Sequence, residues 1–104
     1  MSENEVEIIR SEMKEYVFGW GRRYSDWCVG VTENAKQRLF GDYHVNEKND
    51  AWIYRAASSS DIARKIELYF IDIGVKSDPR TKNEYAEIYL YKINNHDTNK
   101  SNNK

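Results

Sequence analysis

The chain of 104 residues is long enough for one domain and too short for two of ordinary size. Charged residues make up 32% of the chain and hydrophobic residues 39%, yet the net charge is only −1. This balance excludes a protein held on DNA or RNA by bulk positive charge, although it leaves room for a local basic patch.

The single cysteine, Cys28, excludes an intrachain disulfide and is typical of a reducing compartment. The first residues are acidic and polar, and they lack the basic and apolar segments of a signal peptide. No apolar run approaches the roughly 20 residues that a membrane-spanning helix needs. We therefore expect a soluble cytoplasmic protein without a membrane partner.

Three elements are predicted in the first half of the chain. Apolar residues three and four positions apart predict a helix over residues 6–20. A short run of aromatic and β-branched residues predicts a buried strand at 27–31. Thr32 or Asn34 is suited to cap a short helix that runs to about Phe40.

The second half of the chain repeats this alternation. A loop, a strand, a helix with serine caps at its start, a second loop and a third strand are predicted at residues 42–50, 51–56, 61–73, 75–84 and 85–93. Gly74 is suited to the left-handed position that ends the helix. Most Trp and Tyr side chains are expected in the core, namely Trp20, Trp27, Trp52, Tyr54 and Tyr69.

These elements predict an α+β fold in the order α-β-α-β-α-β. Residues 1–93 are expected to form a single small domain, with a three-stranded antiparallel sheet and three helices. Residues 94–104 contain no apolar side chain and are expected to form a disordered polar tail.

One stretch points beyond the fold class. Cys28-Val29-Gly30 is followed, eight residues after the glycine, by Arg38-Leu39. This spacing resembles the second half of the GIY-YIG nuclease signature, and the resemblance covers about residues 26–73. In that family a strand ends in Tyr-Ile-Gly, a short helix carries the arginine, and a later helix carries one metal-binding glutamate, for which Glu67 stands at a matching place.

The resemblance implies a role for several side chains. Arg38 is the expected phosphate clamp, because a guanidinium is a planar, permanently charged fork that suits phosphate oxygens. Glu67 is the expected ligand of Mg²⁺ or Mn²⁺, and His44 is a candidate base near the attacked phosphate. Arg22 and Arg23 form a candidate basic rim for nucleic acid.

The family's first strand, which carries Gly-Ile-Tyr, has no counterpart upstream of residue 26. The last predicted strand carries Tyr89 and Tyr91 and offers a replacement if it pairs beside residues 27–31. The sheet would then be a permuted version of the family's sheet. Either tyrosine would enter the cleft between Arg38 and Glu67.

Two functions remain open at this point. The first is a non-catalytic or degenerate GIY-YIG-like module that binds a protein partner or nucleic acid, which the missing tyrosines and the near-neutral charge favour. The second is a small Mg²⁺- or Mn²⁺-dependent DNA endonuclease. If the motif match is accidental, Arg38 and Glu67 are expected on opposite faces of the sheet.

Overall fold

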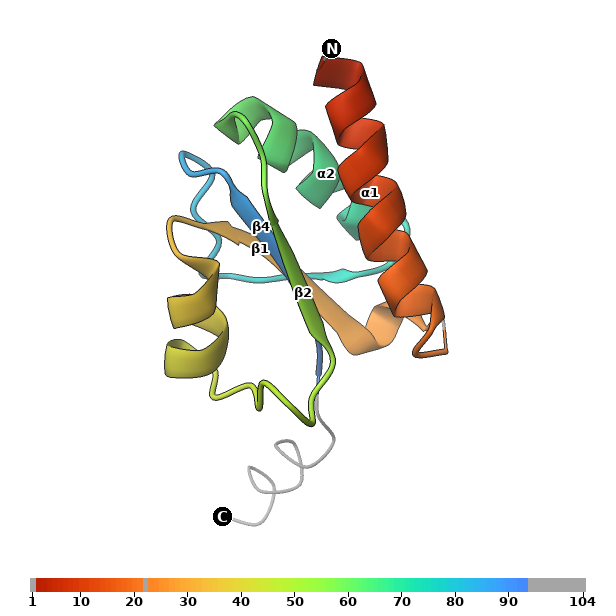
Figure 1. Ribbon diagram of the computed structural model, residues 1–104, viewed down its shortest axis with the longest axis vertical. Helices are drawn as coiled ribbons and strands as arrows, with labels where there is room; N and C mark the ends of the chain where they lie inside the picture. The colour runs from red at the N-terminus through yellow and green to blue at the C-terminus, as the bar shows by residue number, and fades with distance from the viewer. Residues whose placement is uncertain (1, 22, 94–104) are drawn as a thin grey trace.

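The computed structural model describes residues 2–21 and 23–93, and a four-stranded sheet lies at its centre (Figure 1). In spatial order the strands are β2 (Trp52–Ala56), β4 (Glu87–Lys92), β1 (Trp27–Thr32) and β3 (Lys76–Ser77). β4 is antiparallel to both of its neighbours, whereas β3 is parallel to β1. The α+β class is confirmed, but the predicted three-stranded antiparallel sheet is wrong because a fourth strand makes the sheet mixed.

The fourth strand comes from the segment that was predicted to be a loop. After α2 (Ser60–Asp72) the chain runs along the open edge of β1, and the Asp78 N–H donates to the Val29 carbonyl at 2.9 Å. Further along, the Lys82 N–H donates to the Val31 carbonyl at 2.7 Å. These bonds satisfy backbone groups of β1 that would otherwise be exposed, which is why a polar segment is held against the sheet.

The last strand pairs directly with the first, as the permuted sheet requires. β4 lies between β1 and β2, with Gly30 opposite Tyr89 and Tyr54 opposite Tyr89 on the other side. The apolar run of β4 therefore occupies the centre of the sheet, where both of its edges are paired.

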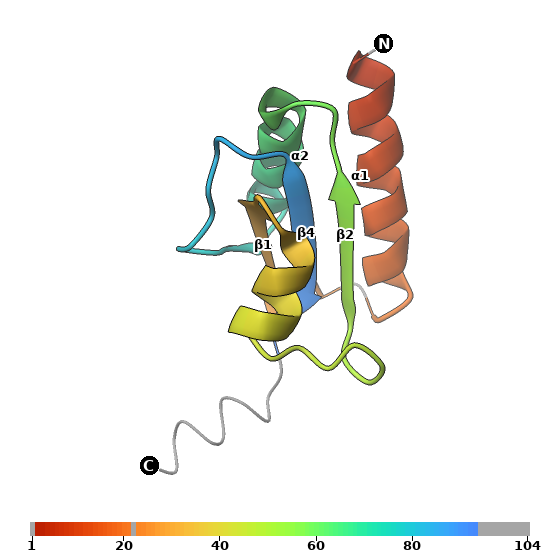
Figure 2. The ribbon, with the colours of Figure 1, turned by 60° about the vertical axis from the view of Figure 1, so that its left-hand side comes forward.

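Helices cover both faces of the sheet. α1 (Ser2–Phe18) and α2 pack on one face, and the short helix η2 (Gln37–Asp42) packs on the other (Figure 2). Alternate residues of each strand divide between the two layers. The main core lies under α1 and α2 and includes Met13, Val17, Trp27, Val29, Val31, Ile66, Phe70, Ile88 and Leu90.

The helix after β1 has a different geometry from the α-helix expected there. Asn34 caps it, because its Oδ1 accepts from the Gln37 N–H at 3.1 Å. Glu87 of β4 accepts from the Ala35 N–H at 2.7 Å and ties the start of the helix to the sheet. Beyond this point the turns are π-helical and continue through Asp42.

The aromatic side chains divide between the core and the surface. Trp27 is fully buried, as expected, whereas Trp20 follows the end of α1 and is 46% exposed. Trp52 and Tyr54 are half-buried on the edge strand β2. The expectation of a core position is therefore wrong for Trp20, whereas Trp52 and Tyr54 pack against the smaller core cluster beneath η2.

Two further sequence expectations concern the tail and membrane-spanning helices. Residues 94–104, expected to form the tail, lie outside the described residues. Among residues 2–21 and 23–93, no helix has both the length and the apolar character that crossing a bilayer requires.

The cap of α2 provides a test of how this helix is anchored. Ser59 precedes the helix in extended conformation, and its Oγ accepts from the Ile62 N–H at 3.2 Å. Ser59→Ala is expected to lower the free energy of unfolding by about 1 kcal/mol, because one N–H at the helix start loses its acceptor. Urea unfolding measures this change. Ser59→Asp is the control and should retain the stability, and equal stability of all three proteins would contradict this role.

Candidate functional site

Gly30 lies in the middle of β1, opposite Tyr89 of β4. The ring of Tyr89 passes over the glycine: a Cβ atom at position 30 would lie 2.3 Å from Tyr89 Oη and 3.1 Å from Asp78 Cβ. No side chain fits there unless a buried ring moves. The missing Cβ atom thus lets the phenol of Tyr89 cross β1 and reach the segment after β3.

Asp78 receives that phenol and joins several segments of the chain. It is only 1% exposed, and Tyr89 Oη donates to its carboxylate. Tyr43 Oη donates to Oδ1 at 2.8 Å, and the Arg80 N–H donates to the same oxygen at 2.9 Å. A buried carboxylate needs such partners, because desolvation without hydrogen bonds is costly. Asp78 therefore connects β4, the end of η2 and the loop after β3.

Arg38 completes this cluster from η2. Its side chain is almost fully buried, and Nη1 donates to the Arg80 carbonyl at 2.9 Å and to Tyr89 Oη at 3.1 Å. Nε pairs with Asp42 Oδ2 at 3.2 Å. Tyr89 thus accepts from Arg38 and donates to Asp78. We call these three side chains, together with Tyr43, the tyrosine–aspartate network.

The π-helical geometry of η2 brings two members of the network to the sheet. The Tyr43 N–H donates to the Arg38 carbonyl, five residues earlier, at 3.0 Å. A π turn spaces bonded residues by five positions instead of four. Arg38 and Tyr43 consequently lie on the same side of the turn, and both reach groups around Asp78.

Burial keeps the acidic hydroxyl and thiol groups of this face protonated. Burial and the hydrogen bond to Asp78 raise the pKa of Tyr43 to about 12, and the same two causes raise the pKa of Tyr89 well above its usual value. Burial, followed by the neighbouring Cys28, raises the pKa of Tyr91. Burial also raises the pKa of Cys28 to about 11. These groups are neutral near pH 7, so none is ready to act as a base or as a thiolate nucleophile.

Glu67, the expected metal ligand, lies on the α2 side of the sheet and not beside Arg38. Its side chain is fully buried. Arg64 Nη1 donates to Oε1 at 2.8 Å, and Thr81 Oγ1 donates to Oε2 at 2.7 Å. Both carboxylate oxygens therefore have protein partners in an enclosed place. This does not fit a ligand of Mg²⁺, which keeps several of its waters when it binds.

Glu67 instead holds the loop after β3 from the α2 side of the sheet. Thr81 Oγ1 also accepts from the Val31 N–H at 2.8 Å. The loop after β3 is thus held on both sides of the sheet. The contacts of Asp78 hold it on the η2 side, and the contact with Glu67 holds it on the α2 side. The spacing of apolar residues in the sequence predicts that Glu67 lies at the edge of the apolar face of its helix. The loop that covers this edge was not foreseen, and it is the reason for full burial.

The remaining predicted residues fall in two places. Tyr91 stacks on Tyr89 with ring centroids 6.4 Å apart, and it lines a hollow of about 270 Å³ together with the exposed His44. Arg23 is exposed and pairs with Asp26 at 3.4 Å, whereas Arg22 lies outside the described residues. The basic rim for nucleic acid stays a prediction.

Within residues 2–21 and 23–93, no group of three His, Cys, Asp or Glu side chains is arranged to hold a metal ion. The proposed Mg²⁺ or Mn²⁺ dependence has no ligand set in this part of the chain beyond Glu67, whose contacts do not suit it.

Two members of the network were not found from the sequence. Asp78 stands in a segment that was interpreted as a loop, and Tyr43 was assigned to a polar connection. The signal that was present is a glycine inside a buried strand, since such a glycine often marks the close approach of another group. Which group approaches depends on the pairing of β1 with β4, which local sequence does not reveal.

Comparisons of the chain with protein-family models, with curated proteins and with solved structures give no significant match. The interpretation of the site therefore depends on its geometry.

Gly30→Ala tests the close approach of Tyr89. The added methyl group is expected to lower the free energy of unfolding by about 3 kcal/mol, because a buried ring must move. In a Tyr89→Leu background the same change is expected to cost at least about 1 kcal/mol less, since the obstructing phenol is gone. Gly19→Ala is the control, with its nearest contact at 3.4 Å. Urea unfolding of all variants measures these values, and strict additivity would contradict the contact.

Alkaline pH tests the buried phenols. Their folded-state pKa values are raised, so the stability they contribute is complete below about pH 10, the unfolded value, and is lost as pH rises through the folded values. Urea unfolding should show a decline in stability above about pH 10. In the folded protein, the absorbance of tyrosinate should rise at a higher pH than it does for free tyrosine. Tyr43→Phe should show a shallower decline. An equally steep decline in this variant would argue against the role given to Tyr43.

Proposed function

We propose that this protein is a non-catalytic interaction module that binds a protein partner. The observation that carries the proposal is the separation of the two residues on which catalysis would depend. Arg38 belongs to the tyrosine–aspartate network on the η2 face, whereas Glu67 is enclosed on the α2 face with both oxygens paired. Phosphodiester cleavage needs a phosphate clamp and an activated water at one place.

The contacts of Arg38 support a structural role for it. Its Nε and Nη1 atoms are already paired with Asp42, the Arg80 carbonyl and Tyr89. A phosphate would have to compete with these partners for a guanidinium that is only 6% exposed. Breaking such a buried network leaves unpaired polar groups behind, and this loss opposes substrate binding.

One observation supports descent from GIY-YIG nucleases, and a second observation opposes it. β4 lies beside β1 and brings Tyr89 to Arg38, which is what a permuted sheet requires. The placement of Glu67 on the opposite face is what an accidental match of the motif requires. A module that kept the scaffold and lost its metal site accommodates both observations.

The contact between Tyr89 and Arg38 also favours the second candidate, a metal-dependent DNA endonuclease. In this alternative Arg38 remains the phosphate clamp and Tyr89 lies near the attacked phosphate. The metal would need ligands other than Glu67.

Cleavage assays separate the two functions. Supercoiled, single-stranded and branched DNA are incubated with the purified protein in Mg²⁺ or Mn²⁺, beside Arg38→Lys and Glu67→Gln. We expect all three proteins to give the same background, because Arg38 and Glu67 act in the fold. Arg38→Lys keeps the charge but loses the fork that phosphate recognition uses. Metal-dependent cleavage that this folded variant loses would overturn the proposal in favour of the endonuclease.

A further inference from the structure

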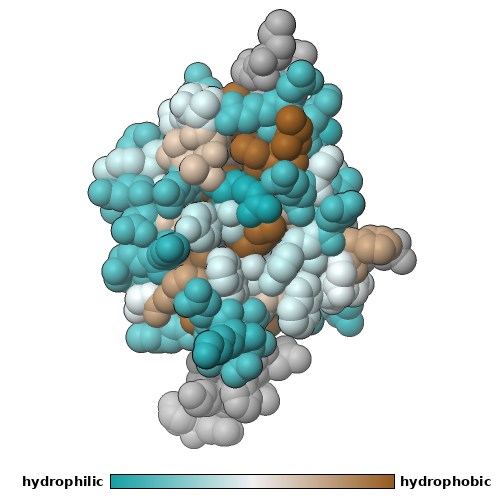
Figure 3. Space-filling view, in the orientation of Figure 1, coloured by the Kyte–Doolittle hydropathy of each residue, from teal (hydrophilic) through white to brown (hydrophobic). Residues whose placement is uncertain are grey.

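A groove follows the outer edge of β2 and encloses about 580 Å³. Tyr16 and Trp20, from α1 and the turn after it, form one wall, and Trp52 and Tyr54 of β2 form the other. Glu47 and its neighbours close one end. Pale and brown side chains gather around β2 in the space-filling view, with polar side chains around them (Figure 3).

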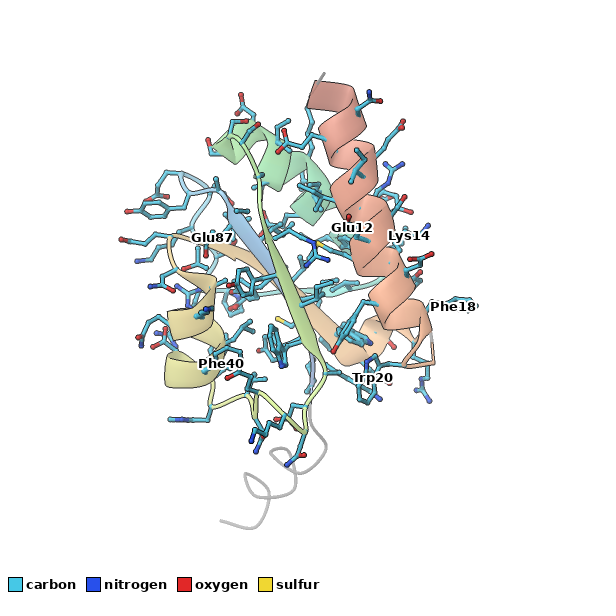
Figure 4. All side chains as sticks on the ribbon, viewed as in Figure 1. Glu12, Lys14, Phe18, Trp20, Phe40 and Glu87 are labelled. Atoms are coloured by element: carbon cyan, nitrogen blue, oxygen red, sulfur yellow. The ribbon has the colours of Figure 1, made fainter. Side chains whose placement is uncertain are left out.

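The rings on each wall come in pairs. The Tyr16 and Trp20 centroids are 6.4 Å apart, and Trp52 stacks on Tyr54 at 6.3 Å with an angle of 19° between the rings. The Phe40 ring of η2 packs edge to face against Trp52, with the ring centroids 4.9 Å apart. Trp20 and Phe40 lie on opposite sides of β2 (Figure 4). The two pairs thus place four aromatic rings along the groove.

Alternate residues of β2 direct their backbone groups into this groove. Ala51 accepts from the Lys92 N–H and Ala57 donates to the Ala86 carbonyl, so the odd-numbered residues of this strand pair with β4. The groups of Trp52, Tyr54 and Ala56 therefore point outward, at the free edge of the sheet.

Two of these outward groups are already paired with side chains. Tyr16 Oη accepts from the Trp52 N–H at 3.1 Å, and Arg55 Nη1 donates to the Tyr54 carbonyl at 2.9 Å. Arg55 is held in place by Glu12 at 2.7 Å. A fifth strand would need both groups for a continuous ladder. The side chains protect the edge and disfavour strand addition.

The groups left over include the Trp52 carbonyl as an acceptor and several donors on and beside the aromatic rings. Within residues 2–21 and 23–93, the Tyr54 N–H, the Tyr54 hydroxyl and the Trp20 indole N–H donate to no protein group, and the Tyr16 hydroxyl has a proton to donate. An occupant that matches these donors offers carbonyl oxygens in a row. Proline has no N–H, and a polyproline II segment leaves its carbonyls without internal partners.

From these features we infer that the groove along β2 binds a proline-rich segment of a partner protein in the polyproline II conformation. Proline rings fill the spaces between the aromatic pairs, and the segment's carbonyls accept from Tyr16, Trp20 and Tyr54. The charged side chains at the groove are of both signs, which suits a peptide better than a phosphate backbone: they are Lys48, Arg55, Glu12, Glu47 and Asp50. The inference rests on the proposed function and names the class of partner.

Titration of the full chain with decaproline tests the inference. We expect shifts of the Trp20 indole and Tyr54 amide signals in NMR spectra, with a Kd on the order of 100 μM. Trp20→Ala should weaken binding at least tenfold, and Tyr54→Phe, which keeps the ring, should weaken it severalfold. Phe18→Ala is the matched control, because Phe18 is an exposed aromatic residue at the end of α1, two positions before Trp20, and lines a different hollow. This variant should bind like the unchanged protein.

Three results would overturn the inference. They are no shift in the groove at millimolar decaproline, equal weakening by Phe18→Ala and Trp20→Ala, and tighter binding in the groove of an alternating Val-Thr peptide or of oligothymidine. These outcomes leave the proposed function standing unless the cleavage assays also find metal-dependent activity. Circular dichroism of each variant confirms that a loss of binding does not come from unfolding.

Discussion

The hydrogen bond from Tyr89 to Asp78 passes over Gly30 and joins the central strand to the segment beyond its neighbour. A glycine inside a strand normally weakens a sheet, because it has no side chain to pack and loses more backbone freedom. Here the phenol of Tyr89 fills the space above it. The same hydroxyl accepts from Arg38, so it anchors η2 to the sheet beside the bond from the Ala35 N–H to Glu87. The segment after α2, the position of η2 and the burial of Arg38 are all coupled through this hydroxyl.

This network also determines what the protein is suited to do. The hydrogen bonds of Tyr89, Asp78, Tyr43 and Arg38 hold this part of the structure rigidly and occupy the groups that make them. Arg38 and Asp78 are of the types used in catalysis, and both make contacts that hold the fold together. Donors with no partner among the described residues also lie at the edge of β2, among aromatic rings, and the proposed peptide site uses them.

The elements could be predicted because their signals are local. Apolar spacing in α2, its serine cap and Gly74 define a helix wherever it packs, and β1 and β4 are runs of aromatic and β-branched residues. The pairing of β4 with β1 was a hypothesis that depended on the resemblance to GIY-YIG nucleases, and the structure has this pairing. The fourth strand was missed because Lys76–Ser77 has no strand pattern of its own. It forms only because β1 offers unpaired backbone groups beside it.

The sequence alone determined the order of the elements other than β3 and η1, the faces of the helices and the presence of Gly30 and Arg38 at a suggestive spacing. Tertiary structure decided what surrounds each polar side chain. Glu67 is sealed by Thr81 from a distant loop, and Arg38 meets Tyr89, which lies 51 residues away in the chain. Whether a carboxylate or guanidinium is catalytic or structural depends on such neighbours, because they set its solvation and occupy its hydrogen-bonding positions. For the same reason the accessibility of the rings along β2 depends on the position of this strand at the edge of the sheet.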